Sequence, residues 1–168
     1  KSYLTMVLDH IQFERQCCDY VGARGGDNCA KNIKPTGKWK TGEQKAAEKF
    51  DNIEWHAMGD GFTWDTKNPE QDIKTTREIW DFAKEKIASH EFDLVVLDEI
   101  NYCCGYGWLD GAEIVSFLEE NRPDWMHLVF TGRNAAQDVV DYADTVTNMT
   151  KVKHAFEKNV MAAQGIEF

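Results

Sequence analysis

The stretch Leu94-Val95-Val96-Leu97-Asp98-Glu99 decides the fold class of this chain. Four consecutive apolar residues with two β-branched valines at their centre predict a short strand that is buried on both faces. Strands of this kind are typical of parallel sheets that are covered by helices. The apolar run ends in two carboxylates, so the strand is expected to stop at residue 97.

The segments on both sides of this stretch alternate between helix and strand patterns. An apolar stripe at helical spacing predicts a helix over residues 72–89; its members are Ile73, Thr76, Ile79, Trp80, Ala83 and Ile87. Further helices are expected at 12–21, 42–50, 110–120 and 135–143, and further strands at 2–8, 53–58, 127–130 and 145–149. This alternation predicts an α/β fold with a mostly parallel sheet and helices on both faces.

Length and composition are those of one globular domain. The chain has 168 residues, of which 42% are hydrophobic and 12% aromatic, enough to build a core and too many aromatics for a disordered chain. We therefore expect a single domain over residues 1–168. No apolar run reaches the roughly 18 residues that a membrane-spanning helix needs, so no membrane span is expected.

The charge balance and the cysteines restrict the function further. The chain carries 19 Lys and Arg against 29 Asp and Glu, a net charge of −10, which disfavours sequence-independent binding to nucleic acid. Four of the five cysteines form adjacent pairs, Cys17-Cys18 and Cys103-Cys104. This spacing fits neither a disulfide framework nor a zinc site. It indicates buried thiols in a reducing compartment, the cytoplasm or the mitochondrial matrix.

Polar residues follow two of the expected strands, at the edge where open α/β sheets bind ligands. Asp98-Glu99 has the form of a Walker B element, in which a carboxylate holds Mg²⁺ beside a nucleotide. Thr131-Gly132-Arg133 places a glycine, which admits close approach of a ligand, before an arginine that can bind phosphate. The alternatives are two solvated acids at a strand end and a turn with a surface arginine.

Two further segments are candidates for binding. Gly61-Phe62-Thr63-Trp64 places two aromatic side chains in a loop, where they either bind a ligand or anchor the loop to the core. Lys151-Val152-Lys153-His154 is a local positive patch in an acidic chain, or an ordinary solvated charge run. His154 has no Cys or His nearby in sequence, so a metal site is not expected there.

The order of these motifs resembles a known family. The segments are GKWKTGE (37–43), GFTWDT (61–66), LVVLDE (94–99), NRP (121–123), TGR (131–133), ADTVTNM (143–149) and VKHAFEKNVMAAQGIEF (152–168). Together they resemble the ATP:corrinoid adenosyltransferases of the CobA/CobO/BtuR type. The resemblance covers about residues 37–168 and leaves residues 1–36 as a divergent portion.

The resemblance implies a P-loop NTPase-like (RecA-like) fold and a reaction. The family transfers the 5′-deoxyadenosyl group of ATP to a cob(I)alamin-type corrinoid and releases triphosphate. The resemblance implies that Glu99 holds Mg²⁺ with Asp98 beside it. It also implies that Phe62 and Trp64 press on the lower face of the cobalt, and that Arg133 lies near the nucleotide phosphates. The C-terminal tail, which carries Lys153 and His154, would pack beside the nucleotide. Family members commonly form homodimers.

The N-terminal portion departs from the family pattern. No GxxxxGK[ST] phosphate loop occurs in the chain. With a strand at residues 3–8, the loop position falls on residues 9–16, DHIQFERQ, which contain no glycine. The buried strand expected after the next helix would fall on the polar segment 29–34. A phosphate cradle depends on glycines that let successive N–H groups converge on the anion.

Three explanations of this departure remain open. In the first explanation the chain is an inactive relative without a cofactor. It then serves as a structural subunit of a larger assembly, for example a mitochondrial one. Alternatively, residues 1–36 are misread and the enzyme is an ordinary one that uses Mg²⁺, ATP and a corrinoid. In the third explanation the site is remodelled to bind its ligand without a phosphate loop.

Overall fold

The computed structural model describes residues 4–9, 19–23, 42–58 and 69–160 of the chain. The strands are β1 (Leu4–Asp9), β2 (Asp19–Ala23), β3 (Ile53–Ala57), β4 (Leu94–Asp98), β5 (His127–Gly132) and β6 (Thr145–Met149). The helices are α1 (Gly42–Ala47), α2 (Pro69–Ala88), α3 (Ile100–Gly105), α4 (Gly111–Asn121), α5 (Gln137–Tyr142) and the short 3-10 helix η2 (Ala155–Lys158).

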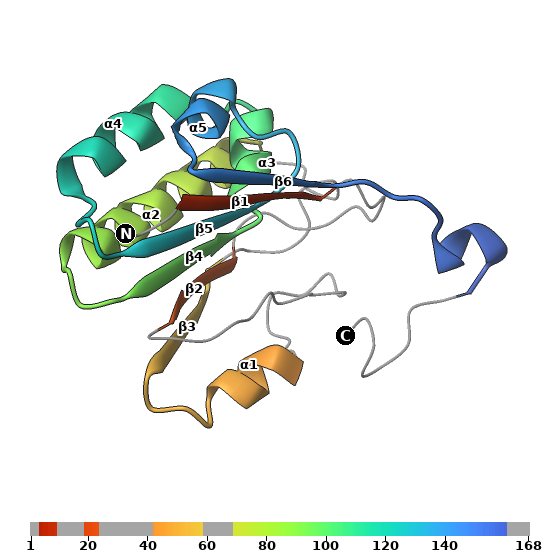
Figure 1. Cartoon of the computed structure of the whole chain (residues 1–168), viewed down its shortest axis with the longest axis horizontal. Helices are drawn as coiled ribbons and strands as arrows, with labels where there is room; N and C mark the ends of the chain where they lie inside the picture. The colour runs from red at the N-terminus through yellow and green to blue at the C-terminus, as the bar shows by residue number, and fades with distance from the viewer. Residues whose placement is uncertain (1–3, 10–18, 24–41, 59–68, 161–168) are drawn as a thin grey trace.

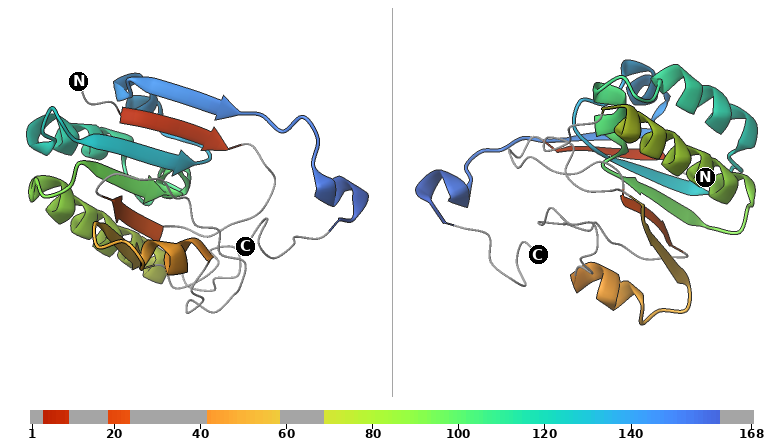
Figure 2. Two further views of the ribbon diagram at one scale, coloured as in Figure 1. Left: turned by 60° about the horizontal axis from the view of Figure 1, so that its bottom comes forward. Right: turned by 180° about the vertical axis from the view of Figure 1, so that it is seen from behind.

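The six strands form one mostly parallel sheet with the order β3-β2-β4-β5-β1-β6 (Figure 1). β4, β5, β1 and β6 run parallel to one another, whereas β2 is antiparallel to both of its neighbours, β3 and β4. Helices α2, α4 and α5 lie on one face, and α1 lies on the opposite face (Figures 1 and 2). The expected α/β fold with helices on both faces is confirmed.

β2 corrects one expectation. The helix expected at 12–21 is wrong for residues 19–21, which are strand; residues 12–18 and the polar segment 29–34 lie outside the described part of the chain. Tyr20 pairs with His56 on one side and with Leu97 on the other, so β2 fills the place between β3 and β4. Pairing with two neighbours at once stabilises the extended conformation, which outweighs a weak local helix pattern.

The core lies between the sheet and α2, α4 and α5. Four members of the expected α2 stripe, namely Ile79, Trp80, Ala83 and Ile87, are buried in the same cluster as Val95, Leu97, Leu128 and Phe130 of the central strands. Trp80 donates a hydrogen bond from Nε1 to Glu113 Oε1 at 3.1 Å and packs edge-to-face on Phe117. Ile73 is an exception, because its side chain is 41% exposed. It lies before the stretch of α2 that meets α4.

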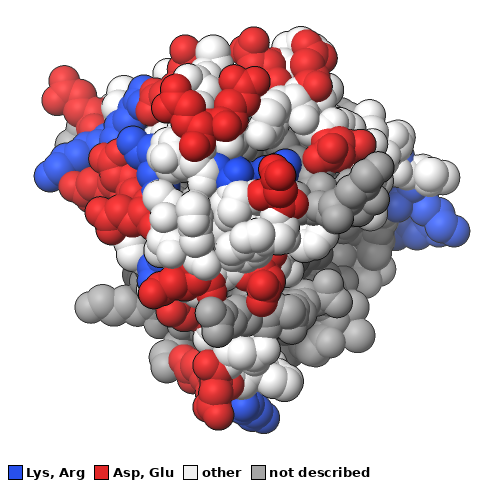
Figure 3. All heavy atoms as spheres, turned by 60° about the vertical axis from the view of Figure 1, so that its left-hand side comes forward, with Lys and Arg blue, Asp and Glu red and all other residues white. Residues whose placement is uncertain are grey.

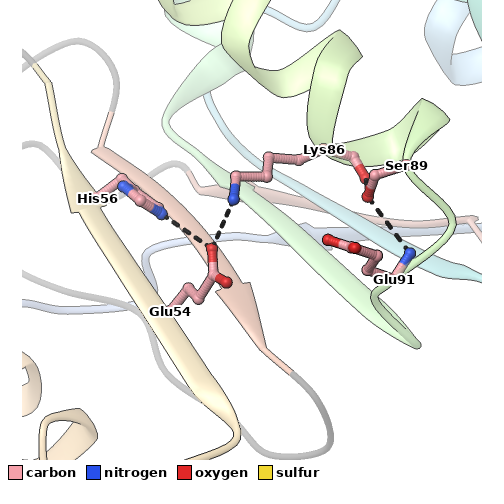
Figure 4. Close-up of polar contacts among 5 residues, drawn as sticks. All are labelled: Glu54, His56, Lys86, Ser89 and Glu91. Atoms are coloured by element: carbon pink, nitrogen blue, oxygen red, sulfur yellow. Dashed lines mark hydrogen bonds and ion pairs between the residues drawn. The ribbon is translucent and has the colours of Figure 1, made fainter.

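A charged pair joins the edge strand β3 to α2 (Figure 4). Lys86 donates to Glu54 Oε2 at 2.7 Å, and His56 Nε2 lies 3.3 Å from the same oxygen. The Lys86 ammonium also lies over the rings of Phe82 and Phe92, 5.4 and 5.2 Å from their centroids. The hydrogen bond from Lys86 holds the pKa of Glu54 below its ordinary value of 4.5, against a smaller opposing effect of burial.

This pair predicts a pH-dependent contribution to stability. A carboxylate whose pKa is lowered on folding stabilises the native state above its unfolded pKa and loses that effect as the pH falls through its folded pKa. Glu54→Gln should therefore lower the free energy of unfolding at neutral pH by at most about 1 kcal/mol, since the pair is part-exposed. The difference should shrink below pH 4.5. Urea unfolding across this range checks it, with the exposed Glu120→Gln as control; a constant difference would contradict the pairing.

Acidic side chains predominate on the face that carries α4 and the amino ends of the parallel strands (Figure 3). An anionic ligand is repelled from that end of the sheet. In the described residues, no helix is both long enough and apolar enough to span a membrane.

Candidate functional site

The carboxyl ends of β4 and β5 bring the first two candidate segments together. Leu97 pairs with Phe130, so the next residues of the two strands, Asp98 and Thr131, lie side by side. Asp98 is only 2% exposed. Its Oδ1 accepts a hydrogen bond of 2.5 Å from Thr131 Oγ1. A buried carboxylate needs such partners, because burial without them strongly disfavours its charged form.

Glu99 follows in an unusual backbone conformation. Its φ of 63° and ψ of 12° are left-handed, which is uncommon for a residue other than glycine. Its N–H donates to Thr131 Oγ1 at 2.8 Å, and the chain then turns directly into α3. The left-handed turn lets β4 end and α3 begin with no loop between them. A strained conformation of this kind persists where the surroundings hold it in place.

Gly132 supplies the space beside Glu99. It has a φ of 110°, and a Cβ at this position would lie 3.2 Å from both Glu99 Cα and Glu99 Oε2 and 3.3 Å from Asn101 Cβ. The sequence predicted that this glycine admits a ligand. The structure shows that it admits the backbone and carboxylate of Glu99, because any side chain would press on them.

Asn101, in the first turn of α3, is a polar residue of this site that the sequence analysis missed. It is 1% exposed, and its Nδ2 has no hydrogen-bond partner among the described residues. α3 itself was not expected, because six residues carry too little periodicity to predict a helix. The only available signal was the position of Asn101, a polar residue three places after Asp98 at the end of a buried strand.

The other candidate residues are placed as follows. Arg133 comes directly after β5 and is half-buried. Lys153 and His154 lie between β6 and η2, in a segment that runs away from the sheet (Figures 1 and 2). There the Glu157 carboxylate accepts a hydrogen bond of 2.6 Å from Lys151 Nζ and one of 3.4 Å from the His154 N–H. The structure therefore does not group Lys153 and His154 with Asp98 and Glu99. Phe62 and Trp64 lie outside the described residues.

The thiols of Cys103 and Cys104 lie in α3, which follows this edge. Cys103 is fully buried and accepts a hydrogen bond from Thr76 Oγ1 at 3.7 Å. Burial raises the pKa of the Cys104 thiol to about 12. Neither thiol forms a disulfide in the described part of the chain, as the sequence predicted for this pair, and a pKa raised this far keeps Cys104 protonated at neutral pH.

The site fits a hard cation that is shared with a phosphate ligand. Asp98 and Glu99 provide carboxylate oxygens, and Mg²⁺ is commonly held by one or two carboxylates together with substrate phosphates. Within the described ranges there is no group of three or more His, Cys, Asp or Glu that could hold a metal ion alone. Asp98 and Glu99 are the two residues of this edge that could hold Mg²⁺ together with a phosphate ligand.

β1 brings the N-terminal portion to the same edge. Val7 pairs with Thr131 and Leu8 with Gly132, on the side of β5 opposite to β4. β1 therefore ends at this edge, beside Thr131 and Gly132. In P-loop folds the phosphate loop follows a strand that ends in this way.

Comparisons with known proteins match most of the chain to one family. Residues 28–168 match the family described as ATP:corrinoid adenosyltransferase BtuR/CobO/CobP. The matched range includes Asp98, Glu99 and Thr131 and does not include β1 or β2.

Individual relatives support the same match. The chain is 41% identical over 134 residues to a corrinoid adenosyltransferase of Sinorhizobium sp. and 40% identical over 132 residues to one of Escherichia coli K12. It is 38% identical over 132 residues to the corrinoid adenosyltransferase CobA of Salmonella typhimurium. Each match covers 79% of this chain, but only 63% of the Sinorhizobium protein and 66% of the other two.

Proposed function

Because the chain belongs to the ATP:corrinoid adenosyltransferase family BtuR/CobO/CobP, we propose that it transfers the 5′-deoxyadenosyl group of ATP to a reduced corrinoid. In this reaction the electron pair of Co(I) attacks C5′ of ATP. A Co–C bond forms, the C5′–O bond breaks, and triphosphate leaves with the bonding electrons. The match of residues 28–168 to the family carries the proposal.

The geometry supports the proposal through the position of its polar groups. Asp98, Glu99 and Thr131 meet at the carboxyl ends of β4 and β5, the edge at which open α/β sheets bind nucleotides. The acidic face in Figure 3 lies at the other end of the sheet. A triphosphate would therefore approach the end of the molecule that is away from this acidic face.

The protein's own residues mainly bind and orient in this mechanism, because the nucleophile is the cobalt. Asp98 and Glu99 would hold Mg²⁺, which neutralises charge on the triphosphate when it is bound. We propose that Arg133, next to β5, binds phosphate oxygens with its planar guanidinium. Lys153 and His154 would have to reach the nucleotide through movement of the segment after β6. The role of Phe62 and Trp64 against the corrinoid rests on the family resemblance.

The phosphate loop is the feature that separates this chain from the family pattern. The first glycine after β1 is Gly22, which lies in β2. A glycine-rich cradle directly after β1 is therefore not available. We propose that phosphate binding relies on Mg²⁺ at Asp98 and Glu99 and on basic side chains.

Calorimetry with MgATP tests this proposal. The chain is expected to bind ATP in the presence of Mg²⁺, and Glu99→Gln should weaken the binding about tenfold or more, as loss of one charged contact does. Glu120→Gln, an exposed change on α4, is the control and should leave the affinity unchanged. No heat with ATP would contradict the proposal and favour a corrinoid-binding or scaffold protein.

The comparisons do not support the structural-subunit alternative, since the relatives described above are named as adenosyltransferases. The homodimer that the resemblance implies stays a prediction, which sedimentation of the purified chain would check.

A further inference from the structure

The hydroxyl of Thr131 joins two residues of the β4 end at once. It lies 2.5 Å from Asp98 Oδ1 and 2.8 Å from the backbone nitrogen of Glu99. Thr131 belongs to a different strand, 32 residues along the chain from Glu99. No local sequence pattern produces such a bridge; it depends on the register between β4 and β5.

The directions of the two hydrogen bonds follow from their chemistry. A backbone N–H can only donate, so Thr131 Oγ1 accepts from Glu99. A hydroxyl carries one hydrogen, which is then available for Asp98. The chain of donors therefore runs from Glu99 N–H through Thr131 O–H to the Asp98 carboxylate. Each bond polarises the next, and a buried carboxylate at the end strengthens both.

Gly132 completes the arrangement from the other side. Thr131 fixes the backbone nitrogen of Glu99, while Gly132 leaves room for Glu99 Cα and Oε2, each of which would lie only 3.2 Å from a Cβ at position 132. Glu99 stands in a left-handed conformation, which persists only where the surrounding structure holds it in place. Both neighbours on β5 therefore act on the conformation of Glu99.

We propose that Thr131 is a positioning residue: its hydroxyl bridges Asp98 and the Glu99 N–H and thereby sets the direction of the Glu99 carboxylate. Toward Mg²⁺ and ATP this inference rests on the proposed function. The part of the inference that concerns the hydrogen bond between Thr131 and the Glu99 N–H rests on the structure alone. Thr131 itself contacts neither the cation nor the nucleotide in this proposal.

Amide hydrogen exchange of the purified chain tests the bridge without any ligand. The Glu99 amide should be protected in the wild type and in Thr131→Ser, which keeps the hydroxyl. In Thr131→Val it should exchange about tenfold faster, the factor that corresponds to a hydrogen bond of about 1.4 kcal/mol. The Val96 amide in the middle of β4 is the internal control and should change less.

Three results of this measurement would overturn the proposal. They are an unprotected Glu99 amide in the wild type, an unchanged rate in Thr131→Val, or an equal acceleration at Val96, which would mean a general loss of stability. If Thr131→Val does not fold, the wild-type protection of Glu99 still decides the question.

A second measurement tests the consequence for the cation. The binding of ATP with Mn²⁺, a paramagnetic substitute for Mg²⁺, is measured in the wild type, Thr131→Val, Thr131→Ser, Glu99→Gln and the Thr131→Val/Glu99→Gln double variant. Thr131→Val should weaken Mn²⁺-ATP about tenfold, Thr131→Ser should restore the binding, and the double variant should bind no more weakly than Glu99→Gln. Additive losses would mean that Thr131 acts independently of Glu99 and would overturn the proposal.

The two measurements separate the two claims. If the wild type does not bind Mn²⁺-ATP, the proposed function fails, while the exchange rate of the Glu99 amide still decides whether Thr131 positions that residue.

Discussion

Glu99→Gln should slow the formation of adenosylated corrinoid by about 10²- to 10³-fold, the usual effect of removing one preorganised electrostatic group. Glutamine keeps the size and shape of the side chain beside Gly132 but removes its charge. The backbone hydrogen bond from residue 99 to Thr131 remains. The loss should therefore appear in the rate with reduced cobalamin and MgATP, with little change in the free energy of unfolding.

Glu120→Gln is the matched control for this rate, because Glu120 is exposed on α4. It removes the same charge from the whole chain without touching the β4 end. If the two variants were equally active, Glu99 would have no part in the reaction. If both were equally slow, the effect would be one of net charge.

Trp80→Ala should lower the free energy of unfolding by about 3–5 kcal/mol, the range for deletion of a large buried aromatic side chain. Trp80 is fully buried at 0% exposure, packs edge-to-face on Phe117 and donates to Glu113. Its removal opens a cavity between α2 and α4 and leaves Glu113 with one donor fewer. A loss of this size is a large fraction of the stability of an ordinary domain, and urea unfolding measures it.

Trp125→Ala provides the comparison within the same residue type. Trp125 is 47% exposed and contacts the ring of His90 edge-to-face. We expect a loss of no more than about 1 kcal/mol, since half of this ring already faces solvent. Equal losses in the two variants would contradict the placement of the core between the sheet and α2.

The central strands could be predicted from the sequence because their signal is local. Residues 94–97 form an apolar run that is typical of a strand buried on both faces, and β4 contains all four of them. α2 shows an apolar stripe that runs over about four helical turns, from Ile73 to Ile87, although its exposed member Ile73 shows that periodicity does not tell where a partner helix begins.

The antiparallel β2 and the short helix α3 could not be predicted, for a different reason. β2 is five residues long and is stabilised by pairing with Ile53–Ala57 and Leu94–Asp98, which lie far away in the sequence. α3 begins directly after Glu99, whose backbone is left-handed. The residue type, glutamate, does not indicate that conformation. Both elements are set by tertiary contacts.

The candidate site was located from the sequence only in part. The position of Asp98 and Glu99 beside the Thr131 segment follows from the rule that ligands bind at the carboxyl ends of strands. The bridge from Thr131 to both residues, and the close approach of Gly132 to Glu99, required the register between β4 and β5. The buried amide of Asn101 became visible only once α3 was placed.

The measurement that tests the account most directly is the reaction of the purified chain with cob(I)alamin and MgATP under reducing conditions. Our account predicts that cob(I)alamin is converted to adenosylcobalamin with release of one triphosphate for each corrinoid, and that the conversion needs Mg²⁺. Retention of unreacted cob(I)alamin by a folded chain, with no triphosphate released, would contradict it.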